Sequence, residues 1–266
     1  MNRPRPPTRW TSTFKVKLGS TRVRTPDNVA QARSFFDRAL FADPLNVEAL
    51  IGSAWADTVQ GAHLFVTDRL SAFAAAEAKL TRALLSVPDH AVGHSLLGFV
   101  EILTKRAAEG IAECEHASTL DRNLATARFA IGLAKVFIGR AQETEAHIAE
   151  ALRLSPRDTT AYIWMTTAGS AKLHLGRYEH AVAWFRRAIE ANRNNPPAYL
   201  NLAAALAQLD RLDEARSAVR TGLALNPTYT VSRRRASWTA QSDDPTYLAQ
   251  LEPIVEGLRM AGVPEQ

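Results

Sequence analysis

One residue pattern recurs six times along this chain, and it limits the fold to a stacked array of helices. Each copy has a small residue, an apolar residue four positions later, a small residue three positions after that, and Pro or Arg five positions further on. The final positions of successive copies lie 44, 34, 34, 37 and 34 residues apart. A nearly fixed period of this length is typical of arrays of short helical repeats. Such arrays bind other molecules far more often than they catalyse reactions.

The offsets within each copy predict the second helix of a hairpin. Offsets of zero, four and seven place three side chains on one face of a helix. The two small residues allow another helix to approach closely, and Pro cannot continue the helix, so each helix must have ended there. The first helices of the hairpins are expected at residues 49–59, 91–103, 125–137, 159–175 and 197–209. Several have a small residue near the middle, such as Gly98 and Gly132, which predicts close helix contacts.

The pattern resembles the tetratricopeptide repeat (TPR), a helix–turn–helix unit of 34 residues. The resemblance covers about 26–227 and implies an all-α fold, a right-handed superhelical TPR solenoid of about five and a half helix-turn-helix repeats with a C-terminal capping helix. Two departures are visible in the spacing. Ten extra residues lie around 60–69, and the 37-residue spacing predicts a helix lengthened by almost one turn before Gly176.

The chain divides into three expected parts. Residues 1–25 form a basic N-terminal arm that contains prolines, residues 26–227 form the solenoid, and residues 228–266 form C-terminal capping helices and a tail. Asp244 and Pro245 are typical of a helix start, and Pro253 is expected to bend or split that helix.

The arm stands where the first helix of the first repeat would lie, so the next helix is expected to have an uncovered apolar face. The arm folding back and a partner are two interpretations of what covers it. A third is that the chain is a shortened relative of a longer protein. A flexible tail without a role is the alternative to all three.

The net charge of +5 comes from the arm. Residues 1–26 hold seven basic residues and no acid, whereas the remainder holds 25 basic and 27 acidic residues. We therefore expect no nucleic-acid binding through the solenoid body, while the arm suits contact with acidic surfaces. No apolar stretch is long enough to span a membrane, and the N-terminus lacks the apolar core of a signal peptide. The single cysteine, Cys114, is expected to be buried and inert, and a cytoplasmic location is expected.

No residue pattern in the chain predicts catalysis, a metal or a cofactor. His90 and His94 have the spacing of two metal ligands but lack a third ligand in phase, so an exposed and partly packed pair is the better interpretation. Phosphate-binding glycine loops, a nucleophile elbow and paired carboxylates are all missing from the sequence. We expect a protein that is not an enzyme.

The expected binding surface is the concave side of the array. Its first-helix positions are mostly apolar, and the residues expected to face it are Ile51, Trp55, Leu96, Phe99, Ile102, Phe129, Leu133, Phe137 and Trp164. Part of this set is expected to be core between repeats, and the rest would form a groove for an amphipathic helix or an extended apolar segment. The predicted partner-binding residues are Trp55, Phe99, Phe129, Phe137, Trp164 and Asn201.

Asn201 also matches the central Asn of the carboxylate clamp that some TPR proteins use to bind peptide C-termini. Ile163 and Thr167 occupy the other clamp positions, so the sequence does not contain that clamp.

The function predicted from these features is a non-catalytic scaffold that binds a protein or peptide partner in its concave groove. Two runs, ADPLNVEALIGSAWAD and YLAQLEPIVEGLRMAGVPEQ, are similar to the C-terminal TPR regions of bacterial adenylate/guanylate cyclase or winged-helix regulator proteins. That resemblance implies a bacterial signalling or regulatory system. The alternative is a small-ligand-sensing module that controls a separate cyclase or transcription-factor output domain. A homo-oligomer stays open.

Overall fold

The computed structural model describes residues 26–62, 66 and 68–266, so the basic arm lies outside the described residues. Within these ranges the chain forms thirteen α-helices and one short 3-10 turn, and it contains no strand. The prediction of an all-α fold is confirmed.

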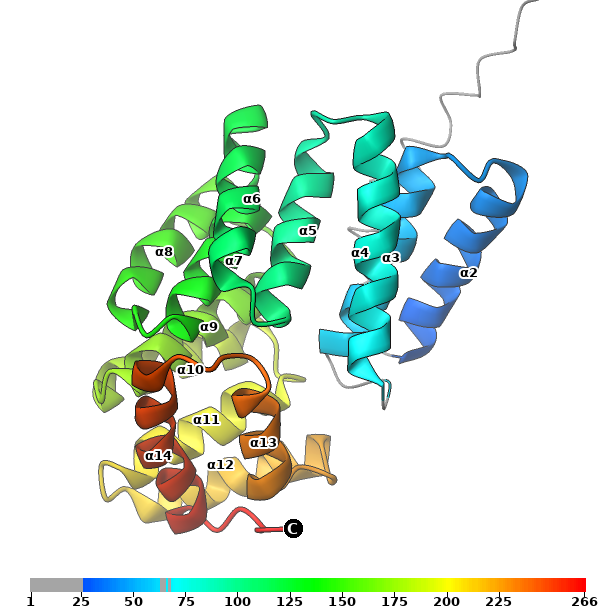
Figure 1. Cartoon of the computed structure of the whole chain (residues 1–266). Helices are drawn as coiled ribbons and strands as arrows, with labels where there is room; N and C mark the ends of the chain where they lie inside the picture. Colours follow the sequence, from blue (N-terminus) through cyan, green and yellow to red (C-terminus); the bar gives the residue numbers. More distant parts are fainter. Residues whose placement is uncertain (1–25, 63–65, 67) are drawn as a thin grey trace, which may run out of the picture.

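The helices form a curved array of antiparallel pairs (Figure 1). A single helix, α2 (Pro26–Ala42), packs on the first helix of the first pair and supplies the half repeat. A 3-10 turn, η1 (Ala141–Glu143), precedes α8. The five hairpins are α3 (Val47–Ala62) with α4 (Arg69–Ser86), α5 (Ala91–Leu103) with α6 (Ala107–Leu120), α7 (Ala125–Phe137) with α8 (Thr144–Leu154), α9 (Ala161–His174) with α10 (Tyr178–Ala191), and α11 (Pro196–Ala207) with α12 (Leu212–Leu225).

The repeated pattern occupies the buried face of every second helix. Its three helical positions are buried in α4, α6, α8, α10 and α12, and its Pro or Arg lies two residues after the helix end. The first copy, in α2, differs because Phe36 is buried while Ala32 and Ala39 are only half-buried. Phe41, at the end of α2, is 92% exposed. Among the described residues, the apolar face of α2 is therefore only partly covered.

The small residues allow the close helix contacts that the sequence predicts. A Cβ atom placed on Gly98 of α5 would lie 2.5 Å from the carbonyl oxygen of Gly110 in α6, far inside van der Waals distance. A Cβ atom on Gly132 of α7 would meet the His147 Cβ at 3.1 Å. The backbones of α5 and α6 are in direct contact because both helices carry glycine where they cross.

The prediction of a lengthened helix before Gly176 is wrong. Helix α9 has 14 residues and α7 has 13, so α9 is longer by one residue only. Most of the extra residues instead lie between Pro156 and Ala161, where the connecting turn is longer than in the other repeats. The insertion around 60–69 lies partly outside the described residues.

The C-terminal helices turn back onto the array. Helix α13 (Val231–Thr239) leads to α14 (Pro245–Met260), which packs on α11 and touches α9 (Figure 1). A Cβ atom on Gly257 would lie 2.7 Å from the Ala204 carbonyl oxygen, so α14 and α11 also meet backbone to backbone. Both α9 and α11 are first helices, so α14 lies against the side of the array that those helices line.

Helix α14 is not split at Pro253, contrary to one of the two outcomes expected there. The helix is continuous from Pro245 to Met260. Pro253 and Ala249 are both exposed, so water can satisfy the carbonyl oxygen that the missing proline N–H leaves without a donor. The Nε2 atom of Gln208 also donates a hydrogen bond to the Pro253 carbonyl, at 2.5 Å.

Candidate functional site

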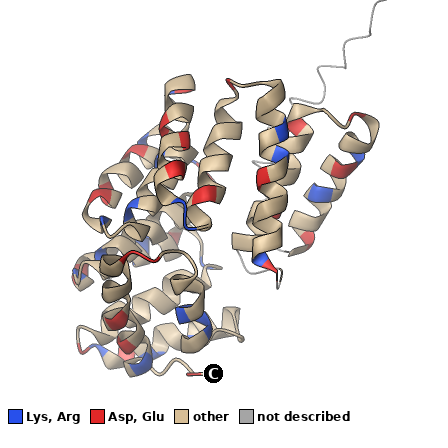
Figure 2. Cartoon of the chain, viewed as in Figure 1, with Lys and Arg blue, Asp and Glu red and all other residues tan. Residues whose placement is uncertain are grey.

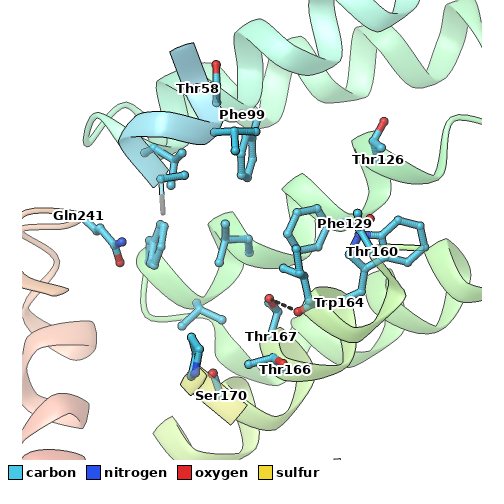
Figure 3. Close-up of a pocket in the computed structure, with 18 of the residues that line it drawn as sticks. Thr58, Phe99, Thr126, Phe129, Thr160, Trp164, Thr166, Thr167, Ser170 and Gln241 are labelled. Atoms are coloured by element: carbon cyan, nitrogen blue, oxygen red, sulfur yellow. Dashed lines mark hydrogen bonds between the residues drawn. The ribbon is translucent and has the colours of Figure 1, made fainter. Parts of the chain in front are cut away.

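The concave side of the array contains a pocket of ≈ 350 Å³. Residues from all five first helices line it, and α13 and α14 complete its wall. The volume lies within the range typical of small-ligand pockets. Figure 3 shows Gln241, which follows α13, on the opposite side of the pocket from the aromatic residues of α7 and α9.

Three aromatic side chains form a row along one wall of the pocket. The ring centroids of Phe99 and Phe129 lie 5.9 Å apart, and those of Phe129 and Trp164 lie 6.1 Å apart with ring planes inclined by 24° (Figure 3). The three residues come from α5, α7 and α9, one from each successive first helix. The repeat spacing therefore builds a continuous apolar surface from residues that are far apart in the sequence.

All six residues predicted for the groove lie on the wall of this one pocket, although this does not test whether they bind a partner. Trp55, Phe99 and Phe129 are half-buried, whereas Phe137 and Trp164 are almost wholly buried. Substitution of the buried pair would therefore disturb the core as well as the pocket surface.

Ile102 differs from the other residues expected on the concave side. It is fully buried and does not line the pocket. A Cβ atom on Gly110 would lie 2.7 Å from Ile102 Cγ1, which places Ile102 in the core between α5 and α6.

The C-terminal segment packs against the wall of the pocket at α7 and α9. The Ser242 hydroxyl donates a hydrogen bond of 2.5 Å to the Phe137 carbonyl oxygen at the end of α7. The Tyr247 ring contacts the Phe137 ring, with centroids 5.6 Å apart, and stacks on the His174 ring of α9 at 5.2 Å. Lys105 also pairs with Asp243, at 2.7 Å. Sequence reasoning missed this contribution to the pocket. The sequence signal for this contribution is the apolar face of the C-terminal helix. That face does not indicate which helices it contacts.

Two polar side chains of the pocket wall are buried with incomplete hydrogen bonding. Asn201 donates through Nδ2 to the Ser170 hydroxyl at 3.3 Å, while its Oδ1 has no partner among the described residues. His174 Nδ1 likewise has no partner there, and burial lowers the pKa of His174 to about 4. Neutral His174 and the amide of Asn201 give this apolar pocket a few polar groups that can orient a ligand.

His90, which caps α5, and His94 within α5 are both half-buried, in agreement with the partly packed pair that the sequence predicts. His90 accepts a hydrogen bond from the Gly93 backbone N–H at 3.1 Å and so caps the helix. The two ring nitrogens of His94 lie 2.6 Å from Glu113 Oε2 and 2.6 Å from the Pro88 carbonyl oxygen. In the described part of the chain, no group of three or more His, Cys, Asp or Glu residues is arranged to hold a metal ion.

Cys114 is fully buried. Burial raises the pKa of its thiol to about 12, so the thiol is protonated at neutral pH and unsuited to nucleophilic chemistry.

The family model described as "Tetratricopeptide repeat" matches residues 172–231, which run from the end of α9 to the start of α13. The chain carries tetratricopeptide repeats. The match covers α10, α11 and α12, which is one and a half repeats of this array, and the helix pairs before residue 172 are arranged in the same way. A search of curated proteins found no match to the sequence.

Several solved structures resemble this TPR array in fold. The Cut9–Hcn1 hetero-tetramer of the APC/C matches with a TM-score of 0.65 and 16% identity, over 78% of this chain and 39% of that chain. A human IFIT1 dimer solved with m7Gppp-AAAA matches with a TM-score of 0.66 and 16% identity, over 91% of this chain and 57% of that one. PilW, described as a widely conserved type IV pilus biogenesis factor, matches with a TM-score of 0.57 and 19% identity, over 77% of this chain and 96% of that one.

The TPR array thus spans about two fifths of the Cut9–Hcn1 chain that it matches. At these identities, the similarity establishes the shared fold alone. None of the helices that the structure describes has the length and hydropathy needed to cross a bilayer.

Proposed function

We propose that this chain is a non-catalytic scaffold that binds an apolar segment of a partner protein or peptide on its concave side, within a bacterial-type regulatory system. The observation that carries the proposal is the pocket itself, where aromatic residues of successive first helices converge on one apolar surface. Large accessible apolar surfaces are uncommon on monomeric proteins and mark interaction sites. The regulatory setting rests only on the sequence resemblance described above.

The test separates loss of binding from loss of folding. Phe99 and Phe129 are half-buried in the pocket wall, so we would replace both with Gln and compare the capture of partners from a cell lysate. The matched control is Leu85→Gln, because Leu85 is 79% exposed on α4 and does not line the pocket. We expect the double variant to lose a partner that the control retains, with circular dichroism unchanged in both. Equal capture by a folded double variant would refute the proposal.

A second candidate function is the sensing of a small apolar ligand. It is favoured by the position of α13 and α14, which close part of the concave side and leave a pocket of ≈ 350 Å³. A pocket of this size holds a small molecule or one to a few side chains of a peptide. A thermal-shift screen against a metabolite library tests this function, because a ligand at 100 times its Kd stabilises the folded state by about 2.7 kcal/mol. The absence of any stabilising compound would favour the scaffold.

A further inference from the structure

Among the described residues, one charged side chain lines the pocket. It is Arg234 of α13, and no described Asp, Glu or Lys lines the pocket. The two neighbouring arginines of α13 are turned elsewhere. Arg233 is exposed and donates to the Thr228 carbonyl oxygen at 3.1 Å, and Arg235 is exposed and pairs with Glu252 at 2.5 Å. Of these three consecutive arginines, which are drawn blue on α13 in Figure 2, only the middle one lines the pocket.

Arg234 has no carboxylate partner. Its Nε atom is buried without a hydrogen bond, and its guanidinium lies over the Trp238 ring at 4.5 Å from the centroid. No acidic residue lies within ion-pair distance of it in the described part of the chain. The residues outside the described ranges contain no Asp or Glu in their sequence, so they supply no carboxylate either. A half-buried guanidinium without a counter-charge is unusual, because desolvated charges are normally paired.

A second guanidinium, that of Arg69, lies outside the set of residues that line the pocket. Arg69, at the start of α4, donates from Nε to the Gly61 carbonyl oxygen at 2.8 Å and is half-buried. Burial and then the positive charge of Arg234 lower the pKa of Arg69, so the two charges repel each other. Arg69 has no ion pair with any described carboxylate. Arg69 itself does not line the pocket, so among the described residues Arg234 is the cation that a ligand in the pocket would meet.

We infer that the pocket binds an apolar molecule that carries a single carboxylate, with the carboxylate held by Arg234 and the apolar body against Phe99, Phe129 and Trp164. A guanidinium is the side chain best suited to bind a carboxylate, through two parallel hydrogen bonds. The aromatic row of α5, α7 and α9 supplies the apolar contact area. The enclosed volume favours a free aliphatic or aromatic acid over a longer chain. This inference rests on the proposed use of the pocket as a binding site, and it deepens the small-ligand candidate.

The experiment is isothermal titration calorimetry on the full chain with matched acids and amides. Decanoate and 3-phenylpropionate are each compared with their primary amides, at low salt, on the wild type, Arg234→Gln and the control Arg233→Gln. We expect at least one acid to bind about tenfold or more tightly than its amide, since a charge-assisted pair is lost with the amide. Arg234→Gln is expected to abolish this difference, and Arg233→Gln to leave it unchanged.

The remaining titrations identify whether the carboxylate belongs to a free acid or to a peptide. They also separate the small-acid inference from the scaffold proposal. Acid and amide binding equally would overturn the assignment of a carboxylate while supporting an apolar pocket. If neither binds, the small-acid inference fails, whereas the scaffold proposal is judged by partner capture with the Phe99 and Phe129 variant. An N-acetyl dipeptide ending in Leu is tested with a free and with an amidated C-terminus. Binding by the free peptide acid alone would overturn the free-acid assignment in favour of the end of a partner chain.

Discussion

The Tyr247 ring stacks on the His174 ring, with centroids 5.2 Å apart and ring planes inclined by 17°. Tyr247 belongs to α14 and His174 to the end of α9, so this contact fastens the C-terminal helix to the concave wall. Both side chains are buried, and both line the pocket. The state of His174 is therefore coupled to the packing of α14 and to the shape of the pocket.

Because His174 is buried in this contact, we predict that the folded state loses stability in acid. The folded state keeps His174 neutral down to about pH 4, whereas the unfolded chain takes up a proton near pH 6.5. Stability is thus fully present above pH 6.5 and is lost as the pH falls from there towards 4. We expect His174→Phe, which keeps an aromatic ring against Tyr247, to reduce the loss of unfolding free energy between pH 7 and pH 4.5 by about 2 to 3 kcal/mol.

Chemical denaturation at the two pH values measures this difference. His180→Gln is the matched control, because His180 lies on the exposed side of α10 and its replacement should leave the pH dependence close to that of the wild type. If His174→Phe shows the same acid loss as the wild type, another group is responsible.

Glu101 of α5 predicts the opposite pH dependence, in which stability falls as the pH rises. Its Oε2 atom is buried without a hydrogen-bond partner, and burial, with the nearby charge of Glu113, raises its pKa to about 7. The unfolded chain ionises this group near pH 4.5, so stability falls as the pH rises from about 4.5 to 7. We expect Glu101→Gln to increase the unfolding free energy at pH 8 by about 1 to 3 kcal/mol and to have little effect at pH 4.5. Glu115→Gln, at an exposed position of α6, should change neither value by more than a few tenths of a kcal/mol.

Spacing alone was enough to predict the hairpins, because each repeat buries its apolar face only on its neighbours. The bounds expected at 91–103 and 125–137 coincide with α5 and α7. The same rule placed Phe99, Phe129 and Trp164 on one surface, since equivalent positions of successive first helices adjoin.

The C-terminal helices were less predictable. The apolar face of α14 could pack on the open end of the array or on its concave side, and nothing local to the helix distinguishes these options. Gly257 is where α14 approaches Ala204, but a lone glycine in a helix does not name its neighbour. The orientation of Arg234 towards the pocket depends on that packing, so the sequence alone does not predict it.

The glycine crossing of α5 and α6 gives a third prediction. Alanine favours an isolated helix over glycine by about 1 kcal/mol, so Gly98→Ala would stabilise α5 if space allowed. A Cβ atom there would instead press on the Gly110 carbonyl oxygen, a backbone atom that cannot rotate away. We expect a net loss of about 1 to 3 kcal/mol in unfolding free energy, typical of overpacking. Gly132→Ala should cost less, because the new methyl group would meet a side-chain atom at 3.1 Å. The reverse order of the two variants in thermal denaturation would contradict this account.

The fourth prediction concerns Asp57, which joins three helices. Its carboxylate in α3 is 1% exposed and pairs with Lys79 of α4 and with Arg33 of α2, the latter at 2.8 Å. Lys79 Nζ also donates to the Ser53 hydroxyl at 2.8 Å. The sequence pattern gives no sign of this network, because Asp57 lies within a run of buried positions of α3.

Asp57→Ala leaves Lys79 and Arg33 without their shared buried anion, so we expect a loss of about 3 kcal/mol in unfolding free energy. Helix α2 is the first helix of the described array, and its contact with Asp57 is one of its anchors. In Asp57→Ala the amides of α2 should therefore exchange hydrogen faster than those of α5. Asp37→Ala is the matched control, because Asp37 also pairs with Arg33, at 3.7 Å, but its side chain is 54% exposed. An exposed pair of this kind contributes about 0 to 1 kcal/mol. Equal destabilisation by the two variants would mean that burial of Asp57 adds nothing, and that α2 is held by its apolar face alone.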